Sequence, residues 1–194
     1  MTDRHQPFPQ HLETPRLLMR PWRLSDSASV RGLWAERDPR SRHVIDSADR
    51  PTVADMRARI LGQLEESTRT GLSLLAIERK VEGDFIGYCG LIVGEGTPAE
   101  PEIAFELFRA AHGHGYATEA ARAVLDAARA TGRTRFWATV RSWNAPSFRV
   151  LEKIGFTADG RVDADAVRGD SVRMTIGGDA TARLRNAGTA TGRP

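Results

Sequence analysis

The sequence predicts a mixed α/β fold in which one sheet of about seven strands carries helices on both faces. Short apolar runs of strand length alternate with longer segments whose apolar residues recur at the helical period. The 194 residues, of which 40% are hydrophobic, suffice for one domain with a sizeable core, and no internal repeat or domain boundary is visible. We therefore expect one domain over residues 12–176, a loose lead-in over 1–11, and a disordered tail over 177–194, where large apolar residues are almost absent.

Composition and charge exclude several classes of protein. The formal net charge is +3 and the isoelectric point is about 9.6, but the arginines are spread along the chain rather than clustered as in a nucleic-acid site. No segment reaches the roughly 18 apolar residues of a membrane span, and the N-terminus lacks the apolar core of a signal peptide. We therefore expect a cytoplasmic protein that binds neither nucleic acid nor membranes. Cys89 is the only cysteine, which excludes a disulfide framework, and its apolar strand favours a buried, inert thiol over a nucleophile.

The first part of the chain predicts a strand, a short helix and a polar loop. Thr14–Pro21 has the composition of a strand that ends at its proline. Ser25 or Asp26 is placed to cap a short helix. Arg37–Arg50 contains four arginines, and two interpretations stay open for it, a solvated loop and a loop that faces the substrate. The short helix is expected to bury Val30, Leu33 and Trp34.

A second helix and a hairpin follow. Thr52 is placed to cap the helix, Asp55 completes a capping box three residues later, and Gly71 ends the helix. The apolar runs Leu72–Glu78 and Phe85–Val93 are short enough for strands, and the polar turn between them predicts an antiparallel hairpin. The buried stripe of this second helix is expected to contain Val53, Met56, Ile60, Leu61 and Leu64.

The central part of the chain has the order strand, loop, helix. Glu102–Phe108 alternates apolar and polar residues, and His112–Gly115, called the glycine loop below, separates this strand from the next helix. A loop of this kind directs free backbone N–H groups and the positive end of the helix to one point, which suits an anion, above all phosphate. The competing interpretation is a tight turn that merely requires glycine. The helix carries one apolar stripe, formed by Ala117, Ala120, Ala121, Val124, Leu125 and Ala128.

The last part of the chain predicts a strand, a helix and two weaker strands. Asn144 is placed to cap the helix, which tolerates a proline in its first turn and ends at Gly155. The weaker strands lie near Phe156–Val162 and Ser171–Ile176. The strand before the helix, Thr134–Val140, is expected to turn Phe136, Ala138 and Val140 to one face, and the helix to bury Phe148, Leu151 and Ile154.

Two common phosphate-binding loops do not fit the glycine loop. A dinucleotide-binding loop requires a third small residue and an acidic residue at the end of the next strand. Here Thr118 takes the first of these positions, and the next strand ends with Val140 and Arg141. A nucleoside-triphosphate loop requires Gly-Lys-Ser/Thr, which the chain lacks.

Three segments together resemble the GCN5-related N-acetyltransferases, and among these the RimJ/RimL-like branch that acts on N-termini of ribosomal proteins and on related amines. The segments are Thr14-Pro15-Arg16-Leu17 with Arg20-Pro21-Trp22, the run His112–Ala120, and Asn144–Ser147 with Leu151–Phe156. The resemblance extends over residues 12–176. It implies a mostly antiparallel sheet with one pair of parallel strands that splay apart, and it implies that the chain binds acetyl-CoA as a co-substrate.

The resemblance also implies which residues hold acetyl-CoA. Backbone amides of the glycine loop and of the helix start would bind the pyrophosphate, and the preceding strand would pair with the pantetheine arm. His112 stands where the family usually has Gln, Arg or Trp, which changes a side chain but leaves the amides. The residues for the pyrophosphate are Gly113, His114, Gly115, Tyr116, Ala117 and Thr118, those for pantetheine are Phe105, Glu106 and Leu107, and Asn144 and Ser147 match positions near the thioester.

The chemistry of acetyl transfer indicates three catalytic candidates. An amine attacks a thioester only when it is neutral, and a lysine amine of pKa about 10.4 needs more help from a base than an α-amine of pKa about 8. Glu102 and Glu106 lie on one face of their strand, and each is either that base or a surface carboxylate or ion pair. Backbone N–H groups of the splayed strand are available for the oxyanion. The leaving thiolate, of pKa about 8.5, needs only a weak proton donor. The resemblance suggests Ser147, since Leu151 stands where many relatives have a tyrosine acid.

Several questions stay open at this point. The leading function is an N-acetyltransferase acting on a primary amine of a protein N-terminus, an amino acid or another small molecule, and the alternative is a catalytically silent domain that binds acyl-CoA. The basic loop Arg37–Arg50 disfavours a polycationic drug as the acceptor. His112 and His114 have no evident partner ligands, so we expect exposed histidines near phosphate rather than a metal site. Dimers are common in the resembled family, and the sequence leaves the oligomeric state open.

Overall fold

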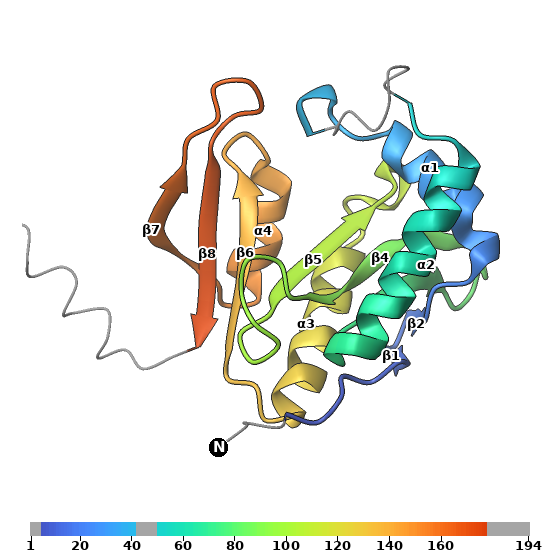
Figure 1. The fold of residues 1–194 in the computed structure, drawn as a ribbon, viewed down its shortest axis with the longest axis horizontal. Coiled ribbons are helices and arrows are strands. Elements are labelled where there is room, and N and C mark those ends of the chain that lie inside the picture. Colours follow the sequence, from blue (N-terminus) through green and yellow to red (C-terminus); the bar gives the residue numbers. More distant parts are fainter. Residues whose placement is uncertain (1–4, 42–49, 178–194) are drawn as a thin grey trace, which may run out of the picture.

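The computed structural model describes residues 5–41 and 50–177, which form one eight-stranded sheet (Figure 1). The strands are β1 (Leu12–Glu13), β2 (Leu17–Arg20), β3 (Leu74–Arg79), β4 (Phe85–Ile92), β5 (Glu102–Leu107), β6 (Arg135–Arg141), β7 (Thr157–Asp163) and β8 (Ser171–Gly177). Their order across the sheet is β1-β2-β3-β4-β5-β6-β8-β7, and all neighbours are antiparallel except β5 and β6. The predicted class, a mixed sheet with one parallel pair, is therefore confirmed.

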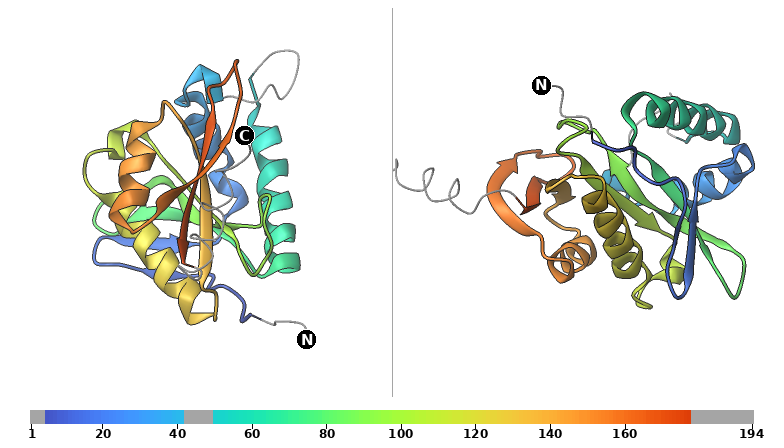
Figure 2. Two further views of the ribbon diagram at one scale, coloured as in Figure 1. Left: turned by 90° about the vertical axis from the view of Figure 1, so that its left-hand side faces the viewer. Right: turned by 90° about the horizontal axis from the view of Figure 1, so that it is seen from below.

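Helices cover both faces of this sheet (Figure 2). The α-helices of the described residues are α1 (Ser27–Ala35), α2 (Val53–Thr70), α3 (Tyr116–Ala130) and α4 (Ala145–Lys153). α1 and α2 lie on one face, and α3 and α4 lie on the other. Single turns of 3₁₀ helix occur at Leu24–Asp26, Pro39–Ser41 and Arg109–Ala111.

The sheet has one strand more than the sequence predicts, and the additional strand is β1, with only two residues. A strand this short shows no alternation, so no pattern in the sequence indicates it.

The N-terminal segment before β1 is packed rather than loose where the structure describes it. The Phe8 side chain is 1% exposed in the main core, and its backbone N–H donates to the Gly71 carbonyl at 2.8 Å.

Asp26 precedes α1, but its side chain does not cap the helix. Its carboxylate accepts hydrogen bonds from the Arg20 guanidinium at 2.8 and 2.9 Å and from the Arg23 N–H at 2.7 Å. Burial alone would raise the pKa of Asp26, but the bonds from Arg20 and Arg23 outweigh burial and lower the pKa overall. The predicted cap is therefore wrong, because a buried arginine on β2 binds this carboxylate instead.

The capping box of α2 is confirmed. The Thr52 hydroxyl accepts from the Asp55 N–H at 3.1 Å, and the Asp55 carboxylate accepts from the Thr52 N–H at 2.7 Å. Gly71 ends the helix in the left-handed conformation, with φ of 69°. The predicted apolar stripe is too wide, because only Met56 and Ile60 are buried, Leu64 is half-buried, and Val53 and Leu61 are 46% and 44% exposed.

The hairpin and the central strands form as predicted. β3 and β4 pair antiparallel, and β4 continues into an antiparallel pair with β5. On the sheet face opposite to α1 and α2, the small side chains of α3 let this helix pack closely on the strands. The predicted apolar stripe of α3 is buried except for Ala117, which is half-buried. In α4 Leu151 is buried, whereas Phe148 and Ile154 are half-buried at the edge of the main core.

Two predicted segments lie wholly or partly outside the described residues. They are positions 42–49 of the polar loop and positions 178–194 of the tail. Gly177, predicted as the first residue of the tail, is the last residue of β8. Within the described ranges, no helix combines the length and the apolar character that crossing a lipid bilayer demands.

Candidate functional site: a cleft where two parallel strands diverge

The parallel strands β5 and β6 pair at one point only and then separate (Figure 1). At that point Glu102 lies opposite Trp137, and the Trp137 N–H donates to the Pro101 carbonyl at 3.2 Å. In a continuous parallel ladder the next donor, the Thr139 N–H, would reach the Ile103 carbonyl. Instead it donates to a side-chain oxygen, Oε1 of Glu102, at 3.2 Å. The ladder therefore stops at Glu102, and the strands beyond it enclose a cleft.

This cleft holds a cavity of about 840 Å³, which lies between β5, β6, the end of α1 and the first turns of α3 and α4. That volume is in the upper range of small-molecule sites, about 300–1,000 Å³. All predicted site residues except His114 line it. They are Glu102, Phe105, Glu106, Leu107, Gly113, Gly115, Tyr116, Ala117, Thr118, Asn144 and Ser147.

The edge of β5 that faces the cleft carries backbone groups without a neighbouring strand. The Phe108 N–H donates to the Ile86 carbonyl of β4 at 2.9 Å, on the opposite edge. Because backbone groups alternate between the two edges of a strand, the N–H groups of Phe105 and Leu107 point toward the cleft. An extended ligand along this edge can therefore pair with β5 as a further strand would.

The glycine loop presents backbone amides at one end of the cleft. Gly113 and Gly115 have φ of 81° and 80°, a region that side chains disfavour, and Gly115 is the N-cap residue of α3. It offers no side chain to cap the helix, so the first amides of α3, from Tyr116 to Thr118, have no acceptor within the helix. Together with the positive end of the helix, these donors are suited to bind an anion.

The two histidines of the glycine loop are exposed, as predicted. Nε2 of His112 lies 3.0 Å from the Leu107 carbonyl, which joins the loop to the end of β5. The His114 ring stacks on Tyr116 with ring centroids 5.7 Å apart. In the residues that the structure describes, no three His, Cys, Asp or Glu side chains gather in a way that could hold a metal ion.

Glu106 is engaged by two neighbours. Arg37 donates to both of its carboxylate oxygens, with Nε at 2.6 Å from Oε1, and the Tyr88 hydroxyl donates to Oε2 at 3.1 Å. Burial raises the pKa of Tyr88 well above its usual value, and the neighbouring Glu106 raises it further, so the hydroxyl remains a donor. Of the two predicted interpretations, an ion pair fits Glu106 better than a free base, because its oxygens are occupied.

Glu102 has a different environment. Burial raises the pKa of its carboxyl to about 7, although the Thr139 N–H lowers the pKa in part. Gly94 makes room for this side chain, because a Cβ at that position would lie 2.4 Å from Oε2 of Glu102 and 3.0 Å from the Trp137 ring. A carboxyl with this pKa, on the wall of a cleft, suits a general base near neutral pH.

The first turn of α4 closes another side of the cavity. Asn144 caps the helix, and its side-chain oxygen accepts from the Ser147 N–H at 3.3 Å. Asn144 therefore has a structural role that agrees with its predicted cap, and Ser147 lies in the first turn and lines the cavity. One turn later Leu151, which is 1% exposed, also lines the cavity.

The described residues of the loop Arg37–Arg50 favour the substrate-facing interpretation. Arg37 and Asp38 line the cavity. The guanidinium of Arg40 lies over the Trp143 ring, 4.3 Å from its centroid, and Trp143 Nε1 donates to the Arg168 carbonyl at 2.7 Å. The loop thereby contacts the far side of the cleft. Composition did not indicate these partners, because they lie far from the loop along the chain.

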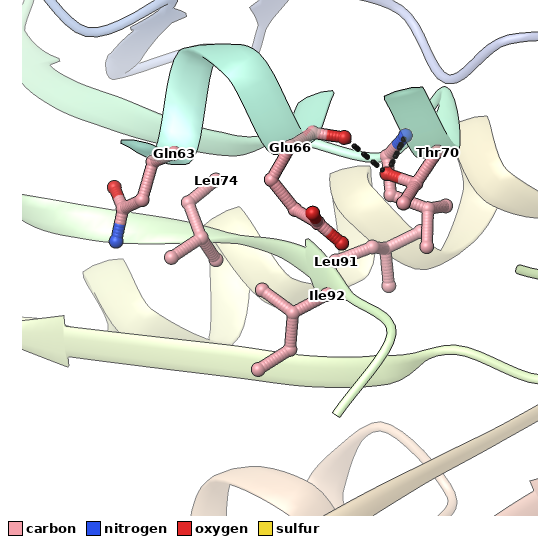
Figure 3. A pocket seen from close by; sticks show the side chains of 7 residues that line it. Gln63, Glu66, Thr70, Leu74, Leu91 and Ile92 are labelled. Carbon is pink, nitrogen blue, oxygen red and sulfur yellow. Dashed lines mark hydrogen bonds between the residues drawn. The ribbon is translucent and has the colours of Figure 1, made fainter. Parts of the chain in front are cut away.

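A second, much smaller pocket lies between α2 and the strands β3 and β4 (Figure 3). Its volume is about 30 Å³, and the Thr70 hydroxyl on its wall donates to the Glu66 carbonyl at 2.8 Å. This space admits little more than water, so the cleft is the better candidate for the functional site.

Comparisons with known proteins agree with this geometry. A family model described as an acetyltransferase (GNAT) domain matches residues 16–157. The protein YkkB of Bacillus subtilis (strain 168) is 39% identical over 89 residues, which are 44% of this chain and 51% of YkkB. The match thus spans about half the length of that curated relative.

Solved structures share the fold. An acetyltransferase from Agrobacterium tumefaciens strain C58 has a TM-score of 0.66 and 27% identity, over 92% of this chain and 99% of that one. RimJ of Mycobacterium smegmatis, solved in complex with CoA-disulfide, has a TM-score of 0.67 and 24% identity, over 89% of each chain. At 24% identity, the likeness to M. smegmatis RimJ concerns the fold alone. Because the family model covers most of the chain, and the resemblance of the three sequence segments agrees with it, this protein belongs to the acetyltransferase (GNAT) family.

Proposed function

We propose that this protein transfers an acetyl group from acetyl-CoA to a primary amine. One observation carries the proposal: a single cavity joins the candidate anion site at the start of α3 to the half-buried carboxyl of Glu102. The reaction needs a binding site for a phosphate-bearing acyl donor and a group that takes a proton from the acceptor amine. The residues that line the cavity are suited to both tasks.

We propose one direction for acetyl-CoA in the cleft. Its pyrophosphate would lie at the amides of residues 113–118, and its pantetheine arm would follow the open edge of β5 past Leu107 and Phe105. The thioester would then lie between Glu102 and Ser147, in the part of the cavity that β5, β6 and α4 enclose. RimJ of M. smegmatis, which shares this fold, was solved in complex with CoA-disulfide, and this supports a CoA-type ligand for the present chain.

Glu102 is the proposed general base. It accepts a proton from the acceptor amine, either directly or through water, so that the amine nitrogen can bond to the acetyl carbon while the carbon–sulfur bond breaks. Its pKa of about 7 is closer to that of an α-amine, about 8, than to that of a lysine amine, about 10.4. The proposed acceptors are therefore α-amines first, of protein N-termini or amino acids, and other small amines second.

Two further groups stabilise charge in the proposed reaction. The N–H of Phe105, which on the open edge of β5 lies nearer to Glu102 than that of Leu107, can donate to the acetyl oxygen as negative charge develops there. The Ser147 hydroxyl can donate to the leaving thiolate, which needs only a weak donor because a thiol has a pKa of about 8.5. Glu106 instead holds Arg37 and, through it, the start of the loop beside the acceptor side of the cleft.

The test is release of free CoA thiol from acetyl-CoA by the purified protein, with a panel of amino acids, small amines and peptides of varied N-terminus. Thiol release that depends on an amine, with acetylated amine found by mass spectrometry, supports the proposal. Glu102→Gln should abolish most of it, whereas Glu65→Gln, on the exposed face of α2, should not. Saturable binding of acetyl-CoA with no turnover on any amine would instead support a catalytically silent acyl-CoA-binding domain.

A further inference from the structure

The segment Thr14–Leu17 resembles a family motif, yet it lies outside the cavity. It forms the turn between β1 and β2, and it contacts the glycine loop and the first turn of α3 about a hundred residues later in the chain. We propose that Arg16 and Glu119 are positioning residues, which hold the glycine loop in the conformation that binds the CoA pyrophosphate. This inference rests on the proposed function, because it assigns a role within the same donor site.

The Glu119 carboxylate, in the first turn of α3, is bound entirely by this turn. Its Oε1 accepts from the Thr14 hydroxyl at 2.6 Å and from the Arg16 backbone N–H at 3.1 Å. Its Oε2 accepts from Nε of Arg16 at 2.6 Å. Burial raises the pKa of Glu119, but these hydrogen bonds outweigh burial and lower the pKa overall, so the carboxylate stays ionised at neutral pH. The helix start and the β1–β2 turn therefore hold a fixed relative position.

The Arg16 guanidinium also orients a peptide of the glycine loop. Its Nη1 donates to the His114 carbonyl at 2.9 Å. The peptide between His114 and Gly115 is planar and trans, so its N–H points opposite to its C=O. Because the carbonyl faces Arg16, the Gly115 N–H faces away from Arg16, and Gly115 is one of the residues that line the cavity. Arg16 thus fixes the direction of one of the proposed pyrophosphate donors.

Arg16 also contacts Gly115, the last residue of the loop, and Tyr116, the first residue of α3. Its guanidinium lies over the Tyr116 ring, 4.5 Å from the centroid, and that ring stacks on His114. A Cβ added to Gly115 would lie 3.6 Å from Nη2 of Arg16, so the side chain packs directly behind this glycine. A loop held in place before the ligand arrives loses less conformational freedom on binding, which raises affinity without any contact between Arg16 and the ligand.

The experiment measures CoA affinity by isothermal titration for the wild type, Arg16→Gln, Glu119→Gln and the double variant. Arg69→Gln serves as a matched control, because Arg69 forms a similar pair with Glu66 on the exposed end of α2. We expect each single variant to bind CoA about tenfold more weakly, equivalent to about 1.4 kcal/mol. The double variant should be no weaker than the singles, because the two residues act as one unit. Arg69→Gln should match the wild type.

Two further readouts separate positioning from a merely structural role. The thermal midpoint of the ligand-free protein should fall only modestly, as expected for the loss of a partly buried ion pair, and the KM for the acceptor amine should stay near the wild-type value. Arg16→Lys, which keeps the charge but cannot bind Glu119 and His114 together, should remain weak. Full recovery of affinity in Arg16→Lys would overturn the proposal, because charge alone would then suffice.

Other outcomes are equally distinct. Unchanged CoA affinity in both single variants would overturn the positioning role while leaving the proposed function intact. A large fall in thermal midpoint with parallel losses for both substrates would show that the contact only maintains the fold, which also overturns it. If the wild type does not bind CoA at all, the proposed function fails first, and this inference fails with it. Should Arg16→Gln not fold, Thr14→Val, which removes one bond to Glu119, tests the same contact.

Discussion

Glu102 on β5 accepts a hydrogen bond from the backbone N–H of Thr139 on β6, at the residue where the parallel ladder ends. A side-chain oxygen here replaces the main-chain carbonyl that a continuous sheet would supply. This side-chain acceptor satisfies the backbone N–H of Thr139 where the strands separate. The hydrogen bond also fixes the carboxyl of Glu102 in the cleft. The same residue thus terminates the strand pairing and faces the proposed acceptor.

Replacing Glu102 tests its role in proton transfer. Glu102→Gln keeps an oxygen that can accept from the Thr139 N–H but cannot take a proton from an amine. We expect kcat to fall about 10²–10⁴-fold, the usual contribution of a general base, with little change in the affinity for acetyl-CoA. Steady-state kinetics with a saturating acceptor would measure this. A variant as active as the wild type would exclude Glu102 as the base.

The pH profile of the wild type should report the same carboxyl. Glu102 acts as a base only when ionised, so kcat/KM should rise as pH increases through about 7. An acceptor amine of low pKa, already neutral at pH 6, keeps the titration of the amine from obscuring that of the enzyme. Glu102→Gln should lack this limb of the profile. The same limb in both proteins would assign it to another group.

Stability should depend on pH through Glu102 as well. The folded-state pKa, about 7, is above the ordinary value of 4.5, so the fold favours the protonated carboxyl. This contribution to stability is fully present below pH 4.5 and is lost as pH rises through about 7. At pH 8 the loss amounts to about 3 kcal/mol at most. Urea unfolding at pH 5 and pH 8 should show Glu102→Gln gaining stability relative to the wild type at pH 8. A stability difference that does not change with pH would contradict the shifted pKa.

The Arg37–Glu106 pair should behave differently, as a structural ion pair. Glu106→Gln removes the carboxylate to which both Nε and Nη2 of the half-buried Arg37 donate, which should destabilise the fold by about 1–3 kcal/mol. The double variant Arg37→Met with Glu106→Leu should recover part of that loss, since no unpaired charge remains. Thermal unfolding of the three proteins measures both effects. If Glu106→Gln keeps full stability and instead loses turnover like a base variant, Glu106 and not Glu102 takes the proton.

The glycine loop offers a test of backbone conformation. Gly115→Ala places a side chain at φ of 80°, which costs about 1 kcal/mol and shifts the loop amides. We expect weaker CoA binding with a modest fall in stability. Gly62→Ala is the matched control, because Gly62 lies within α2 with nothing within 4 Å of an added Cβ, and this change should stabilise the helix slightly. Equal CoA affinity in both variants would argue against a ligand at these amides.

Local patterns predicted the elements whose determinants lie close together in the chain. The Thr52–Asp55 capping box, the stripe of α3 and the glycine loop each occupy a few neighbouring residues, and each forms as expected. Most of the candidate site could be predicted for the same reason, because β5, the glycine loop and α3 follow one another directly in the chain. Only the resemblance to a family assigned α4 to the same site, because no local pattern connects this helix to β5, the glycine loop and α3.

Contacts between different elements could not be predicted in this way. Asp26 is placed to cap a helix, but Arg20 at the end of β2, only six residues earlier, binds its carboxylate, and no pattern in the sequence indicates that pairing. The pairing of Glu106 with Arg37 depends equally on the fold, which places the segment after α1 beside β5. Val53 and Leu61 match the helical period, but they lie at the flanks of the apolar stripe of α2 and are exposed. The period predicts which face of the helix is buried, but it does not predict how wide a part of that face the sheet covers.

Hydrogen exchange of the protein with and without acetyl-CoA tests the location of the donor site most directly. If acetyl-CoA occupies the cleft, exchange should slow at the amides of residues 113–118 and at Phe105 and Leu107, while α2, on the opposite face of the sheet, should exchange as before. The protection should saturate with acetyl-CoA concentration. No protection of these amides at saturating acetyl-CoA, or protection confined to another surface, would contradict the assignment of the cleft as the acetyl-CoA site.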